Sequence, residues 1–400
     1  MPTPADDLPL DTATGLPPVD RATVDADPST PPPSGAPLWL RLVALAGVMF
    51  LFIVALEMMG DGIKGLGEGF AEGLLRATAN PLIGLLTGIL VTSLVQSSST
   101  TTSLVVTLVA TGTLSVPNAI PVIMGANIGT TVTNTIVSMG HVTQPDEFRR
   151  AMAGATVHDF FNWIAVVLLL PLELAFGVIS RPATALAGAL PGVGTSEPGD
   201  TPFEVVAEFA AGLLGGVAWL TALVGLLLLF VALRYLVVIL KGFFLRRSEG
   251  ALDKYVFGRP LVAMGFGLVL TFLVQSSSIT TSLVIPLVGA GVLSVRRVFP
   301  YMLGSNVGTT ATALLAALVA VAGGEPAAQA GLVIALCHLL FNVFGILLVY
   351  PVPPIREIPI RMAEFVGELA FKNRVYAIAY LLGLFYILPL TLELILSAVG

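Results

Sequence analysis

The chain has 400 residues, of which 56% are hydrophobic and 11% are charged, and its formal net charge is −6. Soluble domains carry about 25% charged residues, so this composition excludes an ordinary soluble protein and indicates a polytopic membrane protein. The charge balance offers no basic surface for nucleic acid, and the single cysteine, Cys337, excludes an intramolecular disulfide.

Residues 1–36 form a tail rich in Pro, Asp and Thr, with six aspartates and one arginine. Such a segment cannot bury enough apolar surface to offset its ordering entropy, so we predict that it is disordered. It lacks the basic and apolar regions of a cleaved signal peptide. The first apolar run, near 38–59, is therefore expected to be an uncleaved membrane helix.

Five apolar runs are long enough to cross a hydrocarbon core of about 30 Å, near 38–59, 157–179, 212–240, 329–350 and 375–398. Shorter or Gly/Pro-interrupted apolar stretches lie near 81–95, 99–113, 118–138, 260–274, 279–293 and 298–321. Interrupted segments are tolerated at membrane depth only where they pack in protein or line a cavity. The polar connections are 60–80, 139–150, 180–204, 241–259 and 351–374.

The charges of two connections predict a topology. Loop 241–259 carries five basic residues against two acidic ones, whereas loop 180–204 carries one basic residue, Arg181. The positive-inside rule places the first loop in the cytoplasm and the second outside, with one helix at about 212–240 between them. The Trp and Tyr residues are interpreted as anchors at the membrane interface.

The sequence contains an internal repeat. Residues 96–131 align without a gap to residues 275–310 and are identical at 21 of 36 positions. The shared residues include QSSS, TTSLV and G-x-N-x-GTT, and an H-x-x-F-N motif follows at His158 and at His338. Chance similarity between apolar helices would match Leu and Val rather than Gln, Asn and His. We therefore predict two transporter repeats, 37–200 and 201–400, and expect them to be inverted.

The repeated motif suits both anions and cations. Hydroxyls, amides and free N–H groups at helix starts can hold an oxyanion, and hydroxyl or carbonyl oxygens can coordinate Na⁺. The glycines around Asn127 and Asn306 are expected to let the backbone open there. These glycines are Gly125, Gly129, Gly304 and Gly308. Neither motif contains Arg or Lys, so a multiply charged anion would need co-bound cations, which favours a symporter.

Packing is the competing explanation for small polar residues in membrane helices. A lone SSS would be explained by packing, but two copies with Gln and Asn in register favour a binding site. Asp159 is expected to be functional because an acid inside a membrane segment is costly. For His158 and His338 we expect hydrogen bonds between helices rather than proton handling.

The chain resembles the type II sodium-dependent phosphate cotransporters over about residues 38–398. The resemblance rests on both QSSS blocks, IPVIMGANIGTTVTNTIVS at 120–138, EFRRAMAGATVHDFFNW at 147–163, GSNVGTTATALLAAL at 304–318, ALCHLLFNVFGILLVYP at 335–351 and PIRMAE at 359–364. It implies two inverted repeats whose QSSS motifs lie in re-entrant hairpins that meet near the membrane midplane. Na⁺ and divalent phosphate would bind there together and be exposed alternately to each side of the cell membrane.

The resemblance also assigns residues. It implies a phosphate cradle of Gln96, Ser97, Ser98, Ser99, Gln275, Ser276, Ser277 and Ser278. It implies Na⁺ ligands at Thr135, Asn162, Ser305, Thr309 and Thr312, while Ala153, Ala155 and Asp159 match the pattern of electrogenic members. His141 and Gln144 stand where animal relatives have Gln and Asp, and the short 180–204 loop replaces a large extracellular loop, consistent with a bacterial member.

Other functions fit parts of the same evidence. The fold could move another oxyanion such as arsenate or sulfate, or export phosphate. A membrane-embedded enzyme could use Asp159 and His158 as acid and base, but the duplicated site argues against it. We expect no organic cofactor, and phosphate, Na⁺ and the lipid bilayer as partners. The sequence leaves the oligomeric state open.

Overall fold

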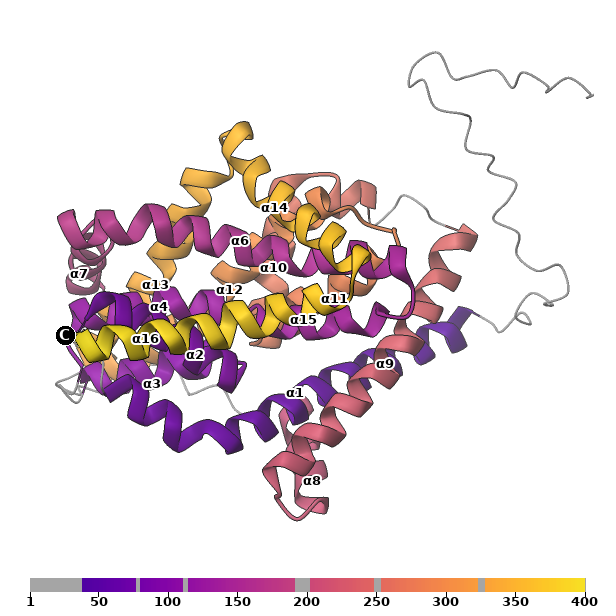
Figure 1. The fold of residues 1–400 in the computed structure, drawn as a ribbon, viewed down its shortest axis with the longest axis horizontal. Coiled ribbons are helices and arrows are strands. Elements are labelled where there is room, and N and C mark those ends of the chain that lie inside the picture. The colour runs from indigo at the N-terminus through magenta and orange to yellow at the C-terminus, as the bar shows by residue number, and fades with distance from the viewer. Residues whose placement is uncertain are drawn as a thin grey trace, which may run out of the picture. The chain divides into compact units, whose positions relative to one another are not determined.

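The computed structural model describes residues 38–76, 80–110, 114–190, 202–247, 253–322 and 328–399. The predicted disordered tail lies outside these residues. Residues 1–43 and 44–400 form separate units, and all relations below concern the second. Every regular element within the described ranges is helical, as Figure 1 shows, which confirms the predicted all-α class.

Within the described ranges, the helices are joined by short connections. In chain order they are α1 (Leu38–Arg76), α2 (Pro81–Val95), α3 (Ser98–Ala110), α4 (Val116–Gly129), α5 (Val132–Ser138), η1 (Met139–His141), α6 (Pro145–Phe176), α7 (Ser180–Ala189), α8 (Pro202–Leu213), α9 (Ala218–Arg247), η2 (Asp253–Phe257), α10 (Pro260–Val274), α11 (Ser277–Gly289), α12 (Val295–Ala322), α13 (Ala328–Val349), α14 (Pro353–Lys372), α15 (Val375–Leu382), η3 (Gly383–Ile387) and α16 (Leu388–Val399).

Five described segments are long and apolar enough to cross a membrane, which confirms a polytopic membrane protein. They are Leu42–Met59, Val116–His141, Pro145–Phe176, Gln329–Val349 and Val375–Leu396. The segment 116–141 appears in the sequence as a shorter interrupted stretch, but its α4, α5 and η1 follow one another almost without a break.

The predicted helix at about 212–240 is α9, which begins later than expected, at Ala218. Helix α8 ends at Leu213, α9 begins at Ala218, and the two axes bend by 119° at the break. Gly215 and Gly216 lie there with φ of +72° and +68°, a left-handed conformation that glycine adopts without steric cost. This turn in the backbone ends α8 and sets the start of α9.

Two predicted polar connections are also helical. Helix α1 continues through 60–76, and α14 occupies most of 351–374. Helix α1 packs against α9 through glycine: a Cβ on Gly225 would lie 2.5 Å from the backbone nitrogen of Met59. Side-chain contacts of α14 with α6 and α12, described below, explain why this polar segment is ordered.

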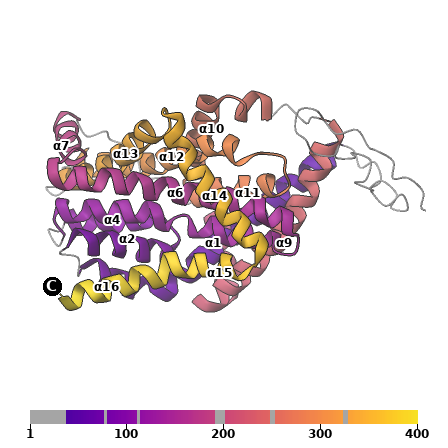
Figure 2. The ribbon, with the colours of Figure 1, turned by 45° about the horizontal axis from the view of Figure 1, so that its top comes forward.

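The sequence repeat has a counterpart in the helix bounds. Helices α2 and α10 begin at Pro81 and Pro260, 179 residues apart, and α3 and α11 begin and end with the same spacing. Proline suits the first position of a helix because its missing N–H has no partner there. Helix α4 packs on α2, and α12 packs on α10; Figures 1 and 2 show α2, α4 and α6 side by side.

Glycines make these two helix pairs close. A Cβ on Gly125 would overlap the carbonyl oxygen of Leu85, and one on Gly304 would overlap that of Met264, its repeat equivalent. Gly129 and Gly308 would likewise meet backbone oxygens of α2 and α10, at 2.7 and 2.6 Å. The prediction that these glycines open the backbone is wrong for Asn306, because α12 runs unbroken through this motif. Only Gly129 borders a break, between α4 and α5.

The two halves pack across each other. Helix α6, from the first half, packs on α11 of the second, and α13 of the second packs on α3 of the first. Helix α5 likewise packs on α11. The helices that carry the repeated motifs therefore meet in the interior.

Candidate functional site

The glutamine of each QSSS motif marks a sharp helix break. Gln96 ends α2 with φ +56° and Gln275 ends α10 with φ +59°, and these are the only non-glycine residues with positive φ in the described chain. Each backbone N–H still donates to a helix carbonyl, Thr92 O or Thr271 O, at 2.7 Å. A left-handed conformation at a non-glycine residue costs about 1–3 kcal/mol and is concentrated at functional sites.

The first serine of each motif starts the next helix. Ser97 Oγ accepts hydrogen bonds from the Thr100 backbone N–H at 3.2 Å and from the Thr100 hydroxyl at 3.0 Å. Ser276 Oγ accepts from the Ile279 N–H at 3.3 Å. These contacts satisfy free donors at the starts of α3 and α11, so part of each Ser cluster is structural.

The remaining motif residues bring the two repeats together. Ser278 Oγ donates to the Gln96 carbonyl oxygen at 3.4 Å, so the two QSSS motifs touch directly. Ser98 and Ser277 are each 4% exposed, whereas Ser99 and Gln275 are half-buried. Gln96 Oε1 is buried and accepts no hydrogen bond from any described residue. A buried acceptor of this kind needs a donor or a cation.

Asn134 joins the first repeat to α11, although the sequence analysis did not single it out. Its Oδ1 accepts from the Thr281 and Ser282 hydroxyls, each at 2.9 Å, and all three side chains are buried. Its position within the polar run TTVTNT is the signal that could have indicated it. The neighbouring Thr135 is fully buried, and its hydroxyl has no partner in the described chain.

The asparagines and histidines of the repeated motifs form a second polar cluster. His158 Nε2 lies 2.6 Å from Asn306 Oδ1, and Asn306 Nδ2 donates to Asn162 Oδ1 at 3.0 Å. Asn162 Nδ2 in turn donates to the Asn127 carbonyl oxygen at 2.9 Å. His338 Nε2 lies 3.3 Å from Asn127 Oδ1. The predicted helix-to-helix hydrogen bonds of both histidines are confirmed.

The hydroxyls of α12 are held by their own helix. Ser305 donates to Tyr301 O and Thr309 donates to Ser305 O, both at 3.1 Å. Each hydroxyl oxygen keeps acceptor capacity, so it can still face a cation. Thr312 lies on α12, and its side chain is outside the described side chains.

Asp159 is fully buried, and its carboxylate does not take part in the hydrogen bonds of Asn162 described above. Tyr380, on α15 near the C-terminus, donates from its hydroxyl to Asp159 Oδ2 at 2.8 Å. The Thr131 side chain also contacts this carboxylate. The interpretation of the tyrosines as interface anchors is therefore wrong for Tyr380, and also for Tyr301, which is 1% exposed and donates to Thr280 O at 2.8 Å.

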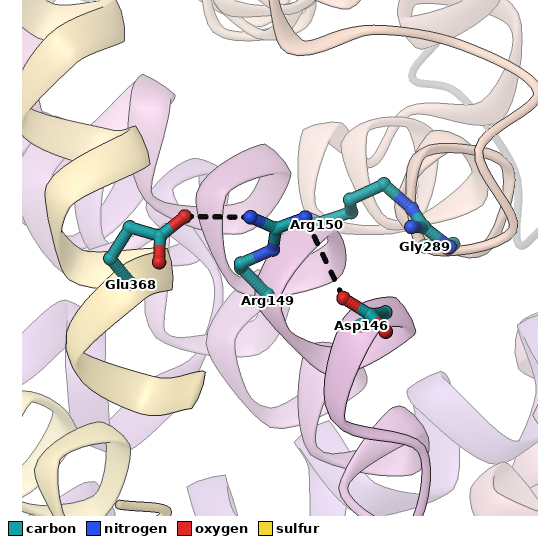
Figure 3. A network of polar contacts seen from close by, with 5 residues as sticks. All are labelled: Asp146, Arg149, Arg150, Gly289 and Glu368. Atoms are coloured by element: carbon teal, nitrogen blue, oxygen red, sulfur yellow. Dashed lines mark hydrogen bonds and ion pairs between the residues drawn. The ribbon is translucent and has the colours of Figure 1, made fainter. Parts of the chain in front are cut away.

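Among the described residues, the basic side chain of Arg150 lies at the C-terminal end of α11, away from the QSSS motif at its start. Figure 3 shows Arg150 reaching Gly289, whose carbonyl oxygen accepts from Nε at 2.9 Å. Positive charge at a helix C-terminus is favourable because the last carbonyls carry partial negative charge. Arg149, beside it, pairs with Glu368 of α14 at 2.8 Å. His141 Nδ1 lies 3.1 Å from Glu147 Oε2, and Gln144 precedes α6.

The chemistry of these clusters favours oxygen coordination of a hard cation. Gln96 Oε1 and the Thr135 hydroxyl are buried oxygens that accept no hydrogen bond from a described residue. In the described ranges no three His, Cys, Asp or Glu residues converge as a metal site would require. The two QSSS motifs present hydroxyls and helix starts without a basic side chain.

These features define a multi-pass, all-α membrane protein in which two copies of one polar motif meet at helix breaks. The chain belongs to the Na⁺/Pi-cotransporter family, whose model matches residues 51–190 and 226–351. This membership confirms the family resemblance seen in the sequence.

Three relatives illustrate the similarity. The chain is 35% identical to human sodium-dependent phosphate transport protein 2B, over 88% of this chain and 64% of that protein. It is 36% identical to the rat protein 2A and 37% identical to the mouse protein 2A, over 88% of this chain and 67% of each relative. The chain thus spans less than two thirds of the human protein's length. No solved structure matches it.

Proposed function

We propose that the protein is a secondary active symporter that couples Na⁺ entry to the uptake of inorganic phosphate across the cell membrane. Membership of the Na⁺/Pi-cotransporter family and similarity to sodium-dependent phosphate transport proteins support this function. Its substrates are then divalent phosphate and Na⁺, and it performs transport rather than a chemical conversion.

The observation that carries the proposal is the direct contact between the two QSSS motifs, from Ser278 Oγ to Gln96 O. The two helices that follow, α3 and α11, begin at these motifs, and helix starts favour anions because their N–H groups point outward. The hydroxyls of Ser98, Ser99 and Ser277 can donate to phosphate oxygens. Half of the cradle comes from each repeat.

Coupling to a cation is supported by the absence of Arg and Lys from both QSSS motifs. Without Arg or Lys, the two negative charges of phosphate must be offset by Na⁺ bound close by. We assign Na⁺ coordination to Thr135, Asn162, Ser305 and Thr309, with Thr312 as a further ligand. Asp159 contributes a buried charge that makes the cycle electrogenic.

The repeated architecture supports transport by alternating access. We propose that the repeats are inverted and that each contributes one re-entrant hairpin, α2–α3 and α10–α11, near the membrane midplane. Cross-packing of α6 on α11 and of α13 on α3 supports a site shared by both halves. Rocking of one half against the other would expose that site to each side in turn.

The test is uptake of labelled phosphate into proteoliposomes that hold the purified protein. An inward Na⁺ gradient should drive uptake, and K⁺ or choline in place of Na⁺ should not. Excess unlabelled arsenate or sulfate separates phosphate from other oxyanions. Uptake that sulfate abolishes and unlabelled phosphate leaves intact would overturn the substrate assignment.

A further inference from the structure

Two crossed hydrogen bonds join the sequence repeats. His158, from the first repeat, reaches Asn306 of the second at 2.6 Å, and His338, from the second, reaches Asn127 of the first at 3.3 Å. All four side chains are at most 4% exposed. Each histidine therefore binds the motif asparagine of the opposite repeat, in a region where water cannot replace the contact.

The donor and acceptor roles follow from the Asn127 backbone carbonyl oxygen, which can only accept and therefore faces Asn162 Nδ2. Asn162 Oδ1 then faces Asn306 Nδ2, which turns Asn306 Oδ1 toward His158, so His158 carries its proton on Nε2 and donates it there. Asn306 Nδ2 then donates to Asn162 Oδ1, and Asn162 Nδ2 donates to Asn127 O. The donors therefore run in one direction, from His158 to Asn127.

This order determines where the oxygen of Asn162 points. Reversing the amide of Asn306 would place its oxygen against Asn162 Oδ1, and reversing both amides would place Asn162 Oδ1 against the Asn127 carbonyl oxygen. Each buried polar group left without a partner costs about 1–3 kcal/mol. Asn162 Oδ1 accepts one hydrogen bond in this arrangement and keeps a second lone pair for a cation.

The second repeat lacks an equivalent relay, meaning a chain of hydrogen bonds that leads from its histidine through an asparagine amide to its own H-x-x-F-N asparagine. Asn342, which corresponds to Asn162, donates to His338 O within its own helix at 3.1 Å, and its Oδ1 has no partner in the described chain. His338 Nδ1 instead contacts the Thr102 hydroxyl at 3.3 Å. His338 therefore orients Asn127 but is not linked through an amide to its own Asn.

We propose that His158 is a positioning residue for Na⁺ binding: its Nε2–H, acting through Asn306, holds Asn162 Oδ1 in the orientation that coordinates Na⁺. The identity of the cation rests on the proposed function. The ring stays neutral and transfers no proton. His338, which has the matching contact without the relay, is the natural control.

The experiment compares side chains that keep or lose the donor. His158→Gln keeps an N–H that can reach Asn306, whereas His158→Phe keeps the ring shape without a donor; His338→Phe is the matched control. Each purified variant is assayed for the apparent KM of Na⁺ and of phosphate in proteoliposomes. The rise in melting temperature on adding Na⁺, against choline, gives a second readout without transport.

His158→Phe should raise the KM for Na⁺ about tenfold or more, the usual effect of losing a group that orients a metal ligand. The KM for phosphate at saturating Na⁺ should not change, and the Na⁺-induced thermal shift should be lost. His158→Gln should stay close to the parental protein, and His338→Phe should change Na⁺ binding less than His158→Phe.

The proposal is overturned if His158→Phe keeps the parental KM for Na⁺ and the parental thermal shift. It is also overturned if His158→Gln is as impaired as His158→Phe, or if His338→Phe weakens Na⁺ binding as much as His158→Phe does. If the phenylalanine variant does not purify as a folded protein, His158→Met replaces it as the variant without a donor. A parental protein that shows the Na⁺ thermal shift without Na⁺-driven uptake overturns the proposed function, and the thermal shifts of the variants alone then decide the positioning role.

Discussion

The hydroxyl of Tyr380 donates to Asp159 Oδ2 at 2.8 Å, across 221 positions of the chain. The contact links α15, which follows the aligned motifs of the second repeat, to the one acid in the middle of α6. A buried carboxylate is costly unless hydrogen bonds or a cation offset its charge. This pair therefore connects α15 to the proposed coupling step.

Replacing the acid tests that step. Asp159→Gly should retain some Na⁺-dependent phosphate uptake but lose net charge movement, because one cation no longer has its counter-charge. Uptake under an imposed potential, inside negative, is the measurement: the parental protein should accelerate and the variant should not. Parental transport that ignores the potential would contradict the electrogenic assignment.

Tyr380→Phe removes only the hydroxyl and leaves the ring, which packs against Phe160 and Phe385. The variant should stay electrogenic, because Asp159 remains, but bind Na⁺ more weakly, because its carboxylate is less constrained. Tyr376→Phe, on an exposed side chain of the same helix, is the control. Equal Na⁺ KM values in the two variants would argue against a role for this hydrogen bond.

The shared cradle predicts equal sensitivity of both repeats. Ser98→Trp or Ser277→Trp should abolish uptake while folded protein remains in the membrane, because each serine is 4% exposed at the junction of its repeat. Uptake and size-exclusion profiles measured together separate loss of transport from loss of folding. Either tryptophan variant transporting at the parental rate would contradict a cradle built from both motifs.

Glycine packing gives a prediction about stability. Gly304→Ala should strongly lower the melting temperature, since its Cβ would overlap the backbone of Met264 in α10. Gly265→Ala, where nothing lies within 4 Å, should be neutral or stabilise by about 0.5–1 kcal/mol, because alanine favours a helix. Equal melting temperatures for the two variants would contradict the close packing of α12 on α10 at Gly304.

The pH dependence of α14 has a defined sign. Arg296 pairs with Glu357 at 2.8 Å and with Glu364 at 3.0 Å, and the Arg296 guanidinium holds the pKa of Glu357 below its ordinary value of 4.5. A lowered folded-state pKa contributes stability above about pH 4.5 that is lost as the pH falls through the folded pKa.

Glu357→Gln should therefore lower the melting temperature slightly at pH 7, and the difference should close in acid below pH 4.5. The contribution is about 0.2–1 kcal/mol because the pair is solvent-exposed. Glu208→Gln, on an exposed side chain of α8, makes the same change in charge and is the control. A difference that widens in acid would contradict the assigned ion pair.

The repeat is the feature that the sequence predicts in most detail. Pro81 and Pro260 start helices, and Gln96 and Gln275 end them, because equal residues at equal spacing meet equal local constraints. Tyr380 could not be predicted, since a single tyrosine in an apolar helix fits an interface anchor equally well. The direction of the Tyr380 side chain depends on how α15 packs, and no equivalent residue in the aligned motifs indicates that direction.

The motif glycines show a second limit of local inference. Glycine permits either an opened backbone or close helix contact, and the partner helix decides between them. At Gly304 the partner is α10, and close contact keeps α12 helical. Asn134 and the crossed histidine contacts depend likewise on which helices meet.

The most direct test of the account is phosphate accumulation against its own gradient. Proteoliposomes holding equal phosphate inside and outside are given an inward Na⁺ gradient, and internal labelled phosphate is followed over time. The account predicts a transient rise above the external concentration that collapses when an ionophore dissipates the Na⁺ gradient and is absent with Ser277→Trp. Phosphate that only equilibrates, at the same rate with Na⁺ or K⁺, would contradict Na⁺-coupled symport.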